Sequence, residues 1–203
     1  MLLFEGKYGK KHQSVWQQFA NDINGTLIPG HYGNADSVEV YFENYKINFD
    51  VYTHYATAGS ATYEMDYIRI NAFFVSRDQL HFAIYRQKPL LAIGKLFGAQ
   101  DIVVGDDIFD KAFIIKGNDA FKIQSLFANK KIKKILLAEK DFRLEIVERE
   151  GLLSEELPKE VSVLYYFTEY TSIDLNQLKS LFVLYQELLT ELTRLGVALP
   201  VKE

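Results

Sequence analysis

The sequence predicts an α+β protein in which a twisted antiparallel sheet, a meander, packs against an N-terminal helix and a long C-terminal helix. Segments in which apolar and polar residues alternate follow one another through the middle of the chain, and the clearest helical periodicity lies near its two ends. Aromatic residues make up 14% of the chain, with 15 Phe and 13 Tyr, which favours pleated surfaces. The 203 residues, 48% of them hydrophobic, can form one domain with a substantial core.

A helix is predicted over residues 10–24. Val15, Trp16, Phe19 and Ile23 fall on one face at helical spacing. We expect Asn24-Gly25 to end this helix, because glycine tolerates the left-handed conformation of a helix cap.

At least four strands of an antiparallel meander are expected next. Residues 38–42 and 47–51 alternate on either side of Asn44-Tyr45 and predict a hairpin. Residues 63–75 predict a long strand and residues 80–84 the next one. Residues 87–107 form a glycine-interrupted apolar stretch, a covering loop or a short helix and strand, and we expect residues 90–97 to cover apolar surface.

The second half of the chain mixes short elements. Residues 109–116 predict a strand, a short helix capped by Asn118 or Asp119 runs to Ala128, and residues 130–137 predict a second short helix or a helix–strand junction. Two more strands are predicted over residues 142–148 and 161–167. We expect one domain over residues 1–203, with the weakest point for a boundary near 105–118.

The last helix has clear start and stop signals. Asp174 is the expected N-cap, with Gln177 completing a capping box and Ile173 and Leu178 forming a hydrophobic staple. Gly196 and Pro200 end the helix.

Five consecutive apolar residues, 181–185, occupy every face of this last helix in its middle. A helix on one sheet needs an apolar stripe of only about 100°, so this helix must be covered on at least two sides. The N-terminal helix or residues 90–97 would provide a cover from within the chain, which we favour. A homodimer through the C-terminal helix is the alternative.

The composition restricts the location and partners. The net charge of −4 gives no reason to expect nucleic-acid binding, and no apolar run is long enough for an integral membrane segment. There is no cysteine, which excludes disulfides and thiolate chemistry and fits a cytoplasmic location. No signal-peptide pattern is present at the start.

Familiar catalytic motifs are absent. The sequence contains no P-loop, no G-x-G-x-x-G, no G-x-S-x-G and no H-E-x-x-H. We therefore expect no cofactor, and neither a common hydrolase nor a kinase.

Clustered aspartates suggest a metal site, because hard cations prefer several oxygen ligands. Asp101 precedes Asp106, Asp107 and Asp110, and the last three are the candidate ligands. The favoured alternative is a turn, in which Asp and Gly are common.

A polar face of the sheet is the candidate ligand site. Asp50, Tyr52 and His54 share a face if the alternation holds, and residues of the following strands could lie beside them. Aromatic walls with a few polar groups are typical of small-ligand pockets. The alternative is a solvent-facing sheet surface with tyrosines paired across strands, which we favour. The candidate ligand-binding residues are Tyr52, His54, Tyr67, Arg69, His81 and Tyr85.

A basic run is a third candidate, for phosphate or lipid headgroups. It comprises Lys130, Lys131, Lys133 and Lys134, with Lys140 and Arg143 nearby. Ile132, Ile135 and Leu136 are interleaved at helical spacing, so the favoured interpretation is the wet side of an amphipathic helix.

One segment resembles a signature in bacterial proteins whose activity is unknown. It comprises Phe109-Asp110-Lys111-Ala112-Phe113, then Gly117-Asn118-Asp119 and a helix through Leu126. In that family an F-[DE]-x-x-F strand leads through a G-x-D turn into a short helix, followed by two strands and a long helix. The resemblance covers the second half of the chain and implies a shared fold segment without an activity.

Two functions remain open at this point. The first is a non-catalytic intracellular protein that binds a partner or a small apolar ligand. The second is a hydrolase-like enzyme using Asp50, His54 and Arg69, with a metal at Asp106, Asp107 and Asp110. Asp50 and His54 are four residues apart on one strand, about 13 Å, so we expect that they do not form a catalytic pair.

Overall fold

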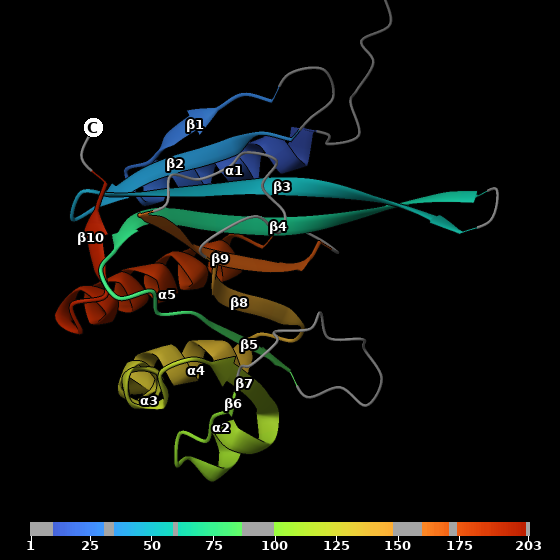
Figure 1. Cartoon of the computed structure of the whole chain (residues 1–203). Coiled ribbons are helices and arrows are strands. Elements are labelled where there is room, and N and C mark those ends of the chain that lie inside the picture. The colour runs from blue at the N-terminus through green and yellow to red at the C-terminus, as the bar shows by residue number, and fades with distance from the viewer. Residues whose placement is uncertain are drawn as a thin grey trace, which may run out of the picture.

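The computed structural model describes residues 10–30, 35–58, 61–86, 100–147, 160–170 and 174–201 (Figure 1). The helices described are α1 (Lys10–Asp22), α2 (Asp107–Ala112), α3 (Ala120–Phe127), α4 (Lys130–Ala138) and α5 (Leu175–Arg194). The strands described are β1 (Thr26–Ile28), β2 (Ser37–Phe42), β3 (Tyr45–Ala58), β4 (Ala61–Ser76), β5 (Phe82–Arg86), β6 (Gln100–Asp101), β7 (Phe113–Gly117), β8 (Phe142–Val147), β9 (Val161–Glu169) and β10 (Ala198–Pro200).

All the described strands belong to one antiparallel sheet with the order β1-β2-β3-β4-β9-β8-β5-β7-β6, and β10 pairs with β4. The predicted α+β class with N- and C-terminal helices is therefore confirmed. The meander holds for β2, β3 and β4 but is wrong for β5, because β9 and β8 lie between β4 and β5. Neighbours in sequence are usually neighbours in a sheet, and here the strands that follow much later in the chain take the central places.

Burial explains why β9 occupies a central place. Five consecutive residues of β9, from Ser162 to Tyr166, are buried on both faces, as in a central strand. The turn between β2 and β3 is tight, with Glu43 and Asn44 both at positive φ, as in the common hairpin turns.

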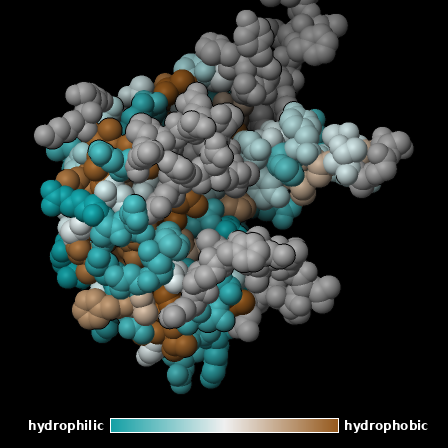
Figure 2. All heavy atoms as spheres, in the orientation of Figure 1, coloured by the Kyte–Doolittle hydropathy of each residue, from teal (hydrophilic) through white to brown (hydrophobic). Residues whose placement is uncertain are grey.

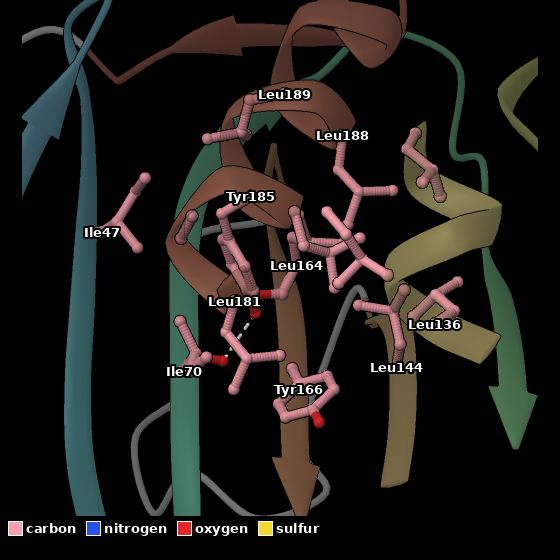
Figure 3. Packing of buried hydrophobic residues seen from close by; sticks show 14 of the residues in the cluster. Ile47, Ile70, Leu136, Leu144, Leu164, Tyr166, Leu181, Tyr185, Leu188 and Leu189 are labelled. Carbon is pink, nitrogen blue, oxygen red and sulfur yellow. Dashed lines mark hydrogen bonds between the residues drawn. The ribbon is translucent and has the colours of Figure 1, made fainter. Parts of the chain in front are cut away.

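The helices lie against one face of the sheet, which we call the covered face. Its side chains include Ile47 and Phe49 of β3, Ile70 of β4, and Leu164 and Tyr166 of β9, all fully buried. Helix α5 lies across these residues, with α4 beside it over Leu144 (Figure 3). The hydroxyl of Tyr185 on α5 donates to the carbonyl oxygen of Ile70 at 2.7 Å and also contacts that of Leu164 at 3.2 Å.

The apolar segment of α5 is covered from within the chain. Leu181, Leu184 and Tyr185 are fully buried, while Phe182 and Val183 are partly buried against the same core. The sheet, α1 and α4 supply the cover. The predicted two-sided burial is confirmed, and the residues that suggested a homodimer are already used inside the monomer.

The predicted start and end of α5 are found, with one change. The Asp174 side chain accepts hydrogen bonds from the backbone N–H groups of Asn176 and Gln177, and Gly196 adopts φ 71° after the last turn. The Gln177 side-chain amide donates to the Glu139 carboxylate, and no hydrogen bond from the Asp174 N–H to Gln177 that would complete the capping box is found among the described residues. Ile173 of the predicted staple lies outside the described residues.

Helix α1 matches its prediction, but its end is made differently. Asn24, with φ 55°, takes the left-handed conformation that we had expected of Gly25. Glycine is needed at position 25 for another reason. A Cβ there would lie 2.9 Å from Val38 Cγ1 and 3.0 Å from the Glu39 carbonyl oxygen, so Gly25 allows the chain to pass close to β2.

The predicted strand over residues 109–116 is wrong in its first half. Residues 107–112 form α2, because the Asp106 side chain caps the helix by accepting from the Phe109 N–H. Phe109 and Phe113 still contact each other, with ring centroids 4.8 Å apart. In the following turn, a Cβ on Gly117 would meet the Ile123 side chain at 2.2 Å, so this glycine lets α3 pack directly on β7.

Strands β3 and β4 extend beyond their neighbours as a two-stranded arm that projects from the body (Figures 1 and 2). The pairing of β4 with β9 begins only at Tyr67. Within the described parts of the chain, no helix is long and apolar enough to cross a membrane. The predicted cover at residues 90–97 lies outside the described residues.

Candidate functional site

The face of the sheet opposite the helices, which we call the polar face, is organised by the register of the strands. Asp50, Arg69, Phe167, Arg143 and Tyr85 are directly opposite one another on successive strands β3, β4, β9, β8 and β5. Because residues opposite each other in antiparallel strands point to the same side, these five side chains form one row across the sheet. After the charged pair Asp50 and Arg69, aromatic and charged side chains alternate along the row.

One end of this row is a rigid ion pair. Arg69 Nε donates to Asp50 Oδ1 at 2.8 Å, and Arg69 Nη2 donates to Asp50 Oδ2 at 2.6 Å. The guanidinium carbon lies 5.2 Å from the centroid of the Tyr52 ring, a cation–π distance. Burial by itself lowers the pKa of Arg69, but the hydrogen bonds and charge of Asp50 outweigh it, so that the pKa is raised.

A hollow of about 190 Å³ adjoins this pair, and its walls are aromatic. It is lined by Tyr52, His54, Tyr67, Tyr165 and Phe167. The Tyr67 and Phe167 rings meet nearly at right angles, 83° at a centroid distance of 5.8 Å. Tyr165 and Phe167 are tilted by 55° at 5.6 Å. The hollow is therefore a corner with walls in several directions.

Tyr165 and Tyr67, two of the walls of the hollow, keep their phenol protons at physiological pH. Burial raises the pKa of Tyr165 to about 12. Burial also raises the pKa of Tyr67, and the negative charge of Glu169, opposite Tyr67 on β9, adds to this effect. These rings thus offer uncharged π faces and phenol groups, not phenolates.

The structure brings together four of the six predicted ligand residues. Tyr52, His54 and Tyr67 line the hollow, and Arg69 flanks it. Tyr85 lies on the same row but three strands away from Arg69, so it does not reach the hollow. His81 is more remote still, before β5, where its backbone N–H donates to Asn118 Oδ1. The prediction that His81 and Tyr85 share a site with Tyr52 is not supported, because β9 and β8 separate the strands.

Tyr85 has a separate environment. Its ring faces the Arg143 guanidinium at 5.9 Å. Its hydroxyl oxygen is buried without a hydrogen-bond partner among the described residues. Burial raises the pKa of Tyr85, and the charges of Lys116 and Arg143 oppose this shift.

Sequence reasoning missed two walls of the hollow, Tyr165 and Phe167. The sequence predicts a strand over residues 161–167, but it does not indicate which strands lie beside it in the sheet. The density of aromatic residues in Tyr165-Tyr166-Phe167 is the signal that could have suggested them.

The arrangement of Asp50 and His54 does not favour the hydrolase hypothesis. Both carboxylate oxygens of Asp50 accept hydrogen bonds from Arg69, and Asn48 adds a long one at 3.4 Å. His54 lies over the Tyr52 ring with a centroid distance of 6.5 Å. No hydrogen bond between Asp50 and His54 is found in the described part of the chain, in line with our expectation for this pair.

The aspartates proposed as metal ligands have other roles. Asp110 accepts from the backbone N–H groups of Val104, Gly105 and Asp106, and Asp106 caps α2. Lys133 pairs with Asp106 and, as the main cause, lowers its pKa. The described residues contain no group of three His, Cys, Asp or Glu that could hold a metal, so Asp106, Asp107 and Asp110 are better explained as a turn and a cap.

The basic run is largely an amphipathic helix, α4, as favoured. Lys131 pairs with Glu187 at 2.8 Å and Lys133 with Asp106, while Ile132, Ile135 and Leu136 are buried. These ion pairs connect α4 to α5 and to the N-cap of α2. The positions of Lys131 and Lys133 therefore do not require a phosphate or a lipid headgroup.

Comparisons with known proteins add information about the fold. No protein-family model matches the sequence, and no curated protein matches it. A solved structure, the crystal structure of the mycobacterial trehalose monomycolate transport factor A, TtfA, is similar with a TM-score of 0.53 and 9% sequence identity. The match covers 96% of this chain and 99% of that chain. At this identity the likeness shows the shared fold alone.

Proposed function

We propose that this chain is a non-catalytic binding protein that holds a small ligand in the aromatic hollow between β3, β4 and β9. The single observation that carries the proposal is the corner of rings formed by Tyr52, Tyr67 and Phe167 beside a fixed ion pair. Ligand sites are concave and mostly apolar, with a few fixed polar groups that orient the ligand.

The hollow is built before a ligand arrives. Tyr165, which lines it, is only 3% exposed, and the Asp50–Arg69 pair fixes the side chains at one edge. Side chains that are already ordered lose little entropy on binding, which improves affinity. The geometry therefore supports binding more directly than chemistry, since Asp50 is occupied by Arg69.

A screen of small fragments by ligand-observed NMR tests the proposal. The set would contain apolar, aromatic, cationic and sugar probes. Trehalose belongs in it because the structural neighbour TtfA is named a trehalose monomycolate transport factor. We expect some probes to bind in the millimolar range and to be displaced from the same site by one another.

Wall variants and a matched control variant test whether the probes bind in the hollow. Tyr67→Ala and Phe167→Ala each remove one wall and are expected to weaken binding about tenfold, the equivalent of losing one good apolar contact surface. Tyr41→Ala is the control, since Tyr41 is a 58% exposed tyrosine of β2 outside the hollow. Thermal melting of each variant checks that it folds. Probe binding that is unchanged in both wall variants, or no binding by any probe, would contradict the proposal.

A further inference from the structure

Among the described residues, acids and bases on the polar face form ion pairs, and one carboxylate beside the hollow lies outside these pairs. Lys46 pairs with Glu39, Arg69 with Asp50, Arg143 with Glu145, and Lys116 with Asp101. The strand register places all these residues on the polar face. Each pair joins one acid and one base, so these eight side chains contribute no net charge.

Glu169 is the exception beside the hollow. It lies directly opposite Tyr67 on β9, at the rim of the ring corner, and it is exposed. No ion pair joins it to a base among the described residues. Its charge is felt in the hollow, because it contributes to the raised pKa of Tyr67.

The shape of the hollow favours a compact group over a flat one. A flat aromatic platform needs ring planes that are nearly parallel, whereas the wall rings here differ in plane by 83° between Tyr67 and Phe167 and by 55° between Tyr165 and Phe167. The volume of about 190 Å³ is below the roughly 300–1,000 Å³ of pockets for drug-sized ligands. A rounded headgroup fits such a corner better than an extended ring system.

One wall of the hollow, the Tyr52 ring, already contacts a cationic side chain. Arg69 lies over the Tyr52 ring at 5.2 Å, and its charge is neutralised by both oxygens of Asp50. The remaining π faces and the carboxylate of Glu169 favour a second positive charge. Corners of aromatic side chains are the usual recognition element for quaternary ammonium groups.

We infer that the ligand of the aromatic hollow carries a quaternary ammonium headgroup of the choline type, held by the Tyr52, Tyr67 and Phe167 rings with Glu169 as the counter-charge. This inference rests on the proposed function and adds the chemical class of the ligand. A permanently charged, poorly hydrated cation suits the hollow because it cannot donate hydrogen bonds that the rings would leave unsatisfied.

Choline chloride and its neutral carbon isostere, 3,3-dimethyl-1-butanol, form the test pair. They have the same shape and differ in the charge. Titrations followed by ligand-observed NMR at constant ionic strength should give choline an affinity about tenfold higher than the isostere, the size of a partly desolvated cation–π contact.

Variants distinguish the contribution of the aromatic rings to choline binding from that of the Glu169 charge. Glu169→Gln is expected to weaken choline binding about threefold while leaving the isostere unchanged, as for an exposed carboxylate. Phe167→Leu keeps an apolar wall without a π face and should reduce the preference for choline over the isostere. Tyr52→Leu is a second wall variant in case Phe167→Leu does not fold. Glu43→Gln, an exposed carboxylate in the β2–β3 turn, is the control and should change neither titration.

The outcomes distinguish this inference from the proposed function. Equal affinity for choline and the isostere, both sensitive to wall variants, would overturn the cation assignment and leave a binding site. Binding of other fragments at these walls without choline binding would also overturn it. If no probe of any class binds, the proposed function itself fails and the inference with it.

Discussion

The two faces of the sheet are built from alternate residues of the same strands, yet they use aromatic side chains differently. On the covered face, Phe49 and Tyr166 are fully buried in the core, as is Tyr185 of the overlying α5. On the polar face, Tyr52, Tyr67 and Phe167 are partly exposed and stand beside ion pairs. The difference teaches that the layer packed above these rings, and not the type of ring, decides whether they are buried in the core or remain accessible at the surface.

The polar groups of the two faces differ in the same way. The Tyr185 hydroxyl on the covered side binds sheet carbonyl groups directly. On the polar face, acids and bases pair with each other across and along strands. Buried polar groups need a fixed partner, because an unsatisfied one costs free energy, whereas the paired charges of the polar face are partly exposed and also contact solvent.

The largest difference between the faces is expected for removal of an apolar side chain. Leu184→Ala, in α5 over the covered face, should lower the free energy of unfolding by about 2–5 kcal/mol, because it leaves a cavity in a fully buried site. Tyr52→Ala on the polar face should cost about 1 kcal/mol. Urea denaturation of both variants provides the comparison, and an unchanged midpoint for Leu184→Ala would show that α5 is not covered as described.

Removing one tyrosine hydroxyl group on each side of the sheet gives a finer comparison of the two faces. Tyr185→Phe removes the donor to the Ile70 and Leu164 carbonyl groups and should cost about 1–2 kcal/mol, as for a buried hydrogen bond. Tyr67→Phe is the polar-face counterpart, where the hydroxyl makes only a 3.8 Å contact to the Met65 sulfur, and it should cost close to nothing. Equal losses of unfolding free energy in the two variants would remove this distinction.

High pH gives a test that involves both faces. The pKa of Tyr165 is raised from 10.0 to about 12, so the folded state keeps a proton that the unfolded chain loses above pH 10. Its contribution to stability is complete below pH 10 and is lost as the pH rises to about 12. Burial raises the pKa of Tyr166 and Tyr185 on the covered face too, with the same sign.

Tyr165→Phe isolates the part that belongs to the polar face. Unfolding free energies between pH 9 and pH 11 should fall less steeply in the variant than in the wild type. The remaining slope comes from tyrosines such as Tyr166 and Tyr185. Identical slopes in the two proteins would mean that the Tyr165 phenol does not hold its proton through this range.

The smallest effect is expected for the ion pair at the edge of the hollow. A double-mutant cycle with Asp50→Asn and Arg69→Met should give a coupling of about 1 kcal/mol, because the pair is bidentate but its two side chains keep 19% and 15% of their exposure to solvent. The coupling should decrease when the salt concentration is raised. A coupling above about 3 kcal/mol would place this pair with the buried groups of the covered face.

Local signals predicted those parts of the fold that depend on neighbouring residues. Asp174 and Gly196 mark the start and the end of α5. The alternation in β3 and β4 correctly placed Asp50, Tyr52, Tyr67 and Arg69 on one face of the sheet. Short segments with two competing patterns were less predictable. Residues 109–112 alternate weakly like a strand, but the Asp106 cap makes them helical.

The sequence by itself determined the α+β class, the two terminal helices and the apolar side of β2, β3 and β4, because these follow from periodicity and capping within a few residues. Only the tertiary structure decided that β9 lies beside β4, and with it that Tyr165 and Phe167 join Tyr52 and Tyr67 while His81 and Tyr85 do not. Strand order is set by contacts between residues about 100 positions apart, such as Arg69 with Phe167. No local pattern records such a contact, since it depends on which strands together bury the most apolar surface beneath α5.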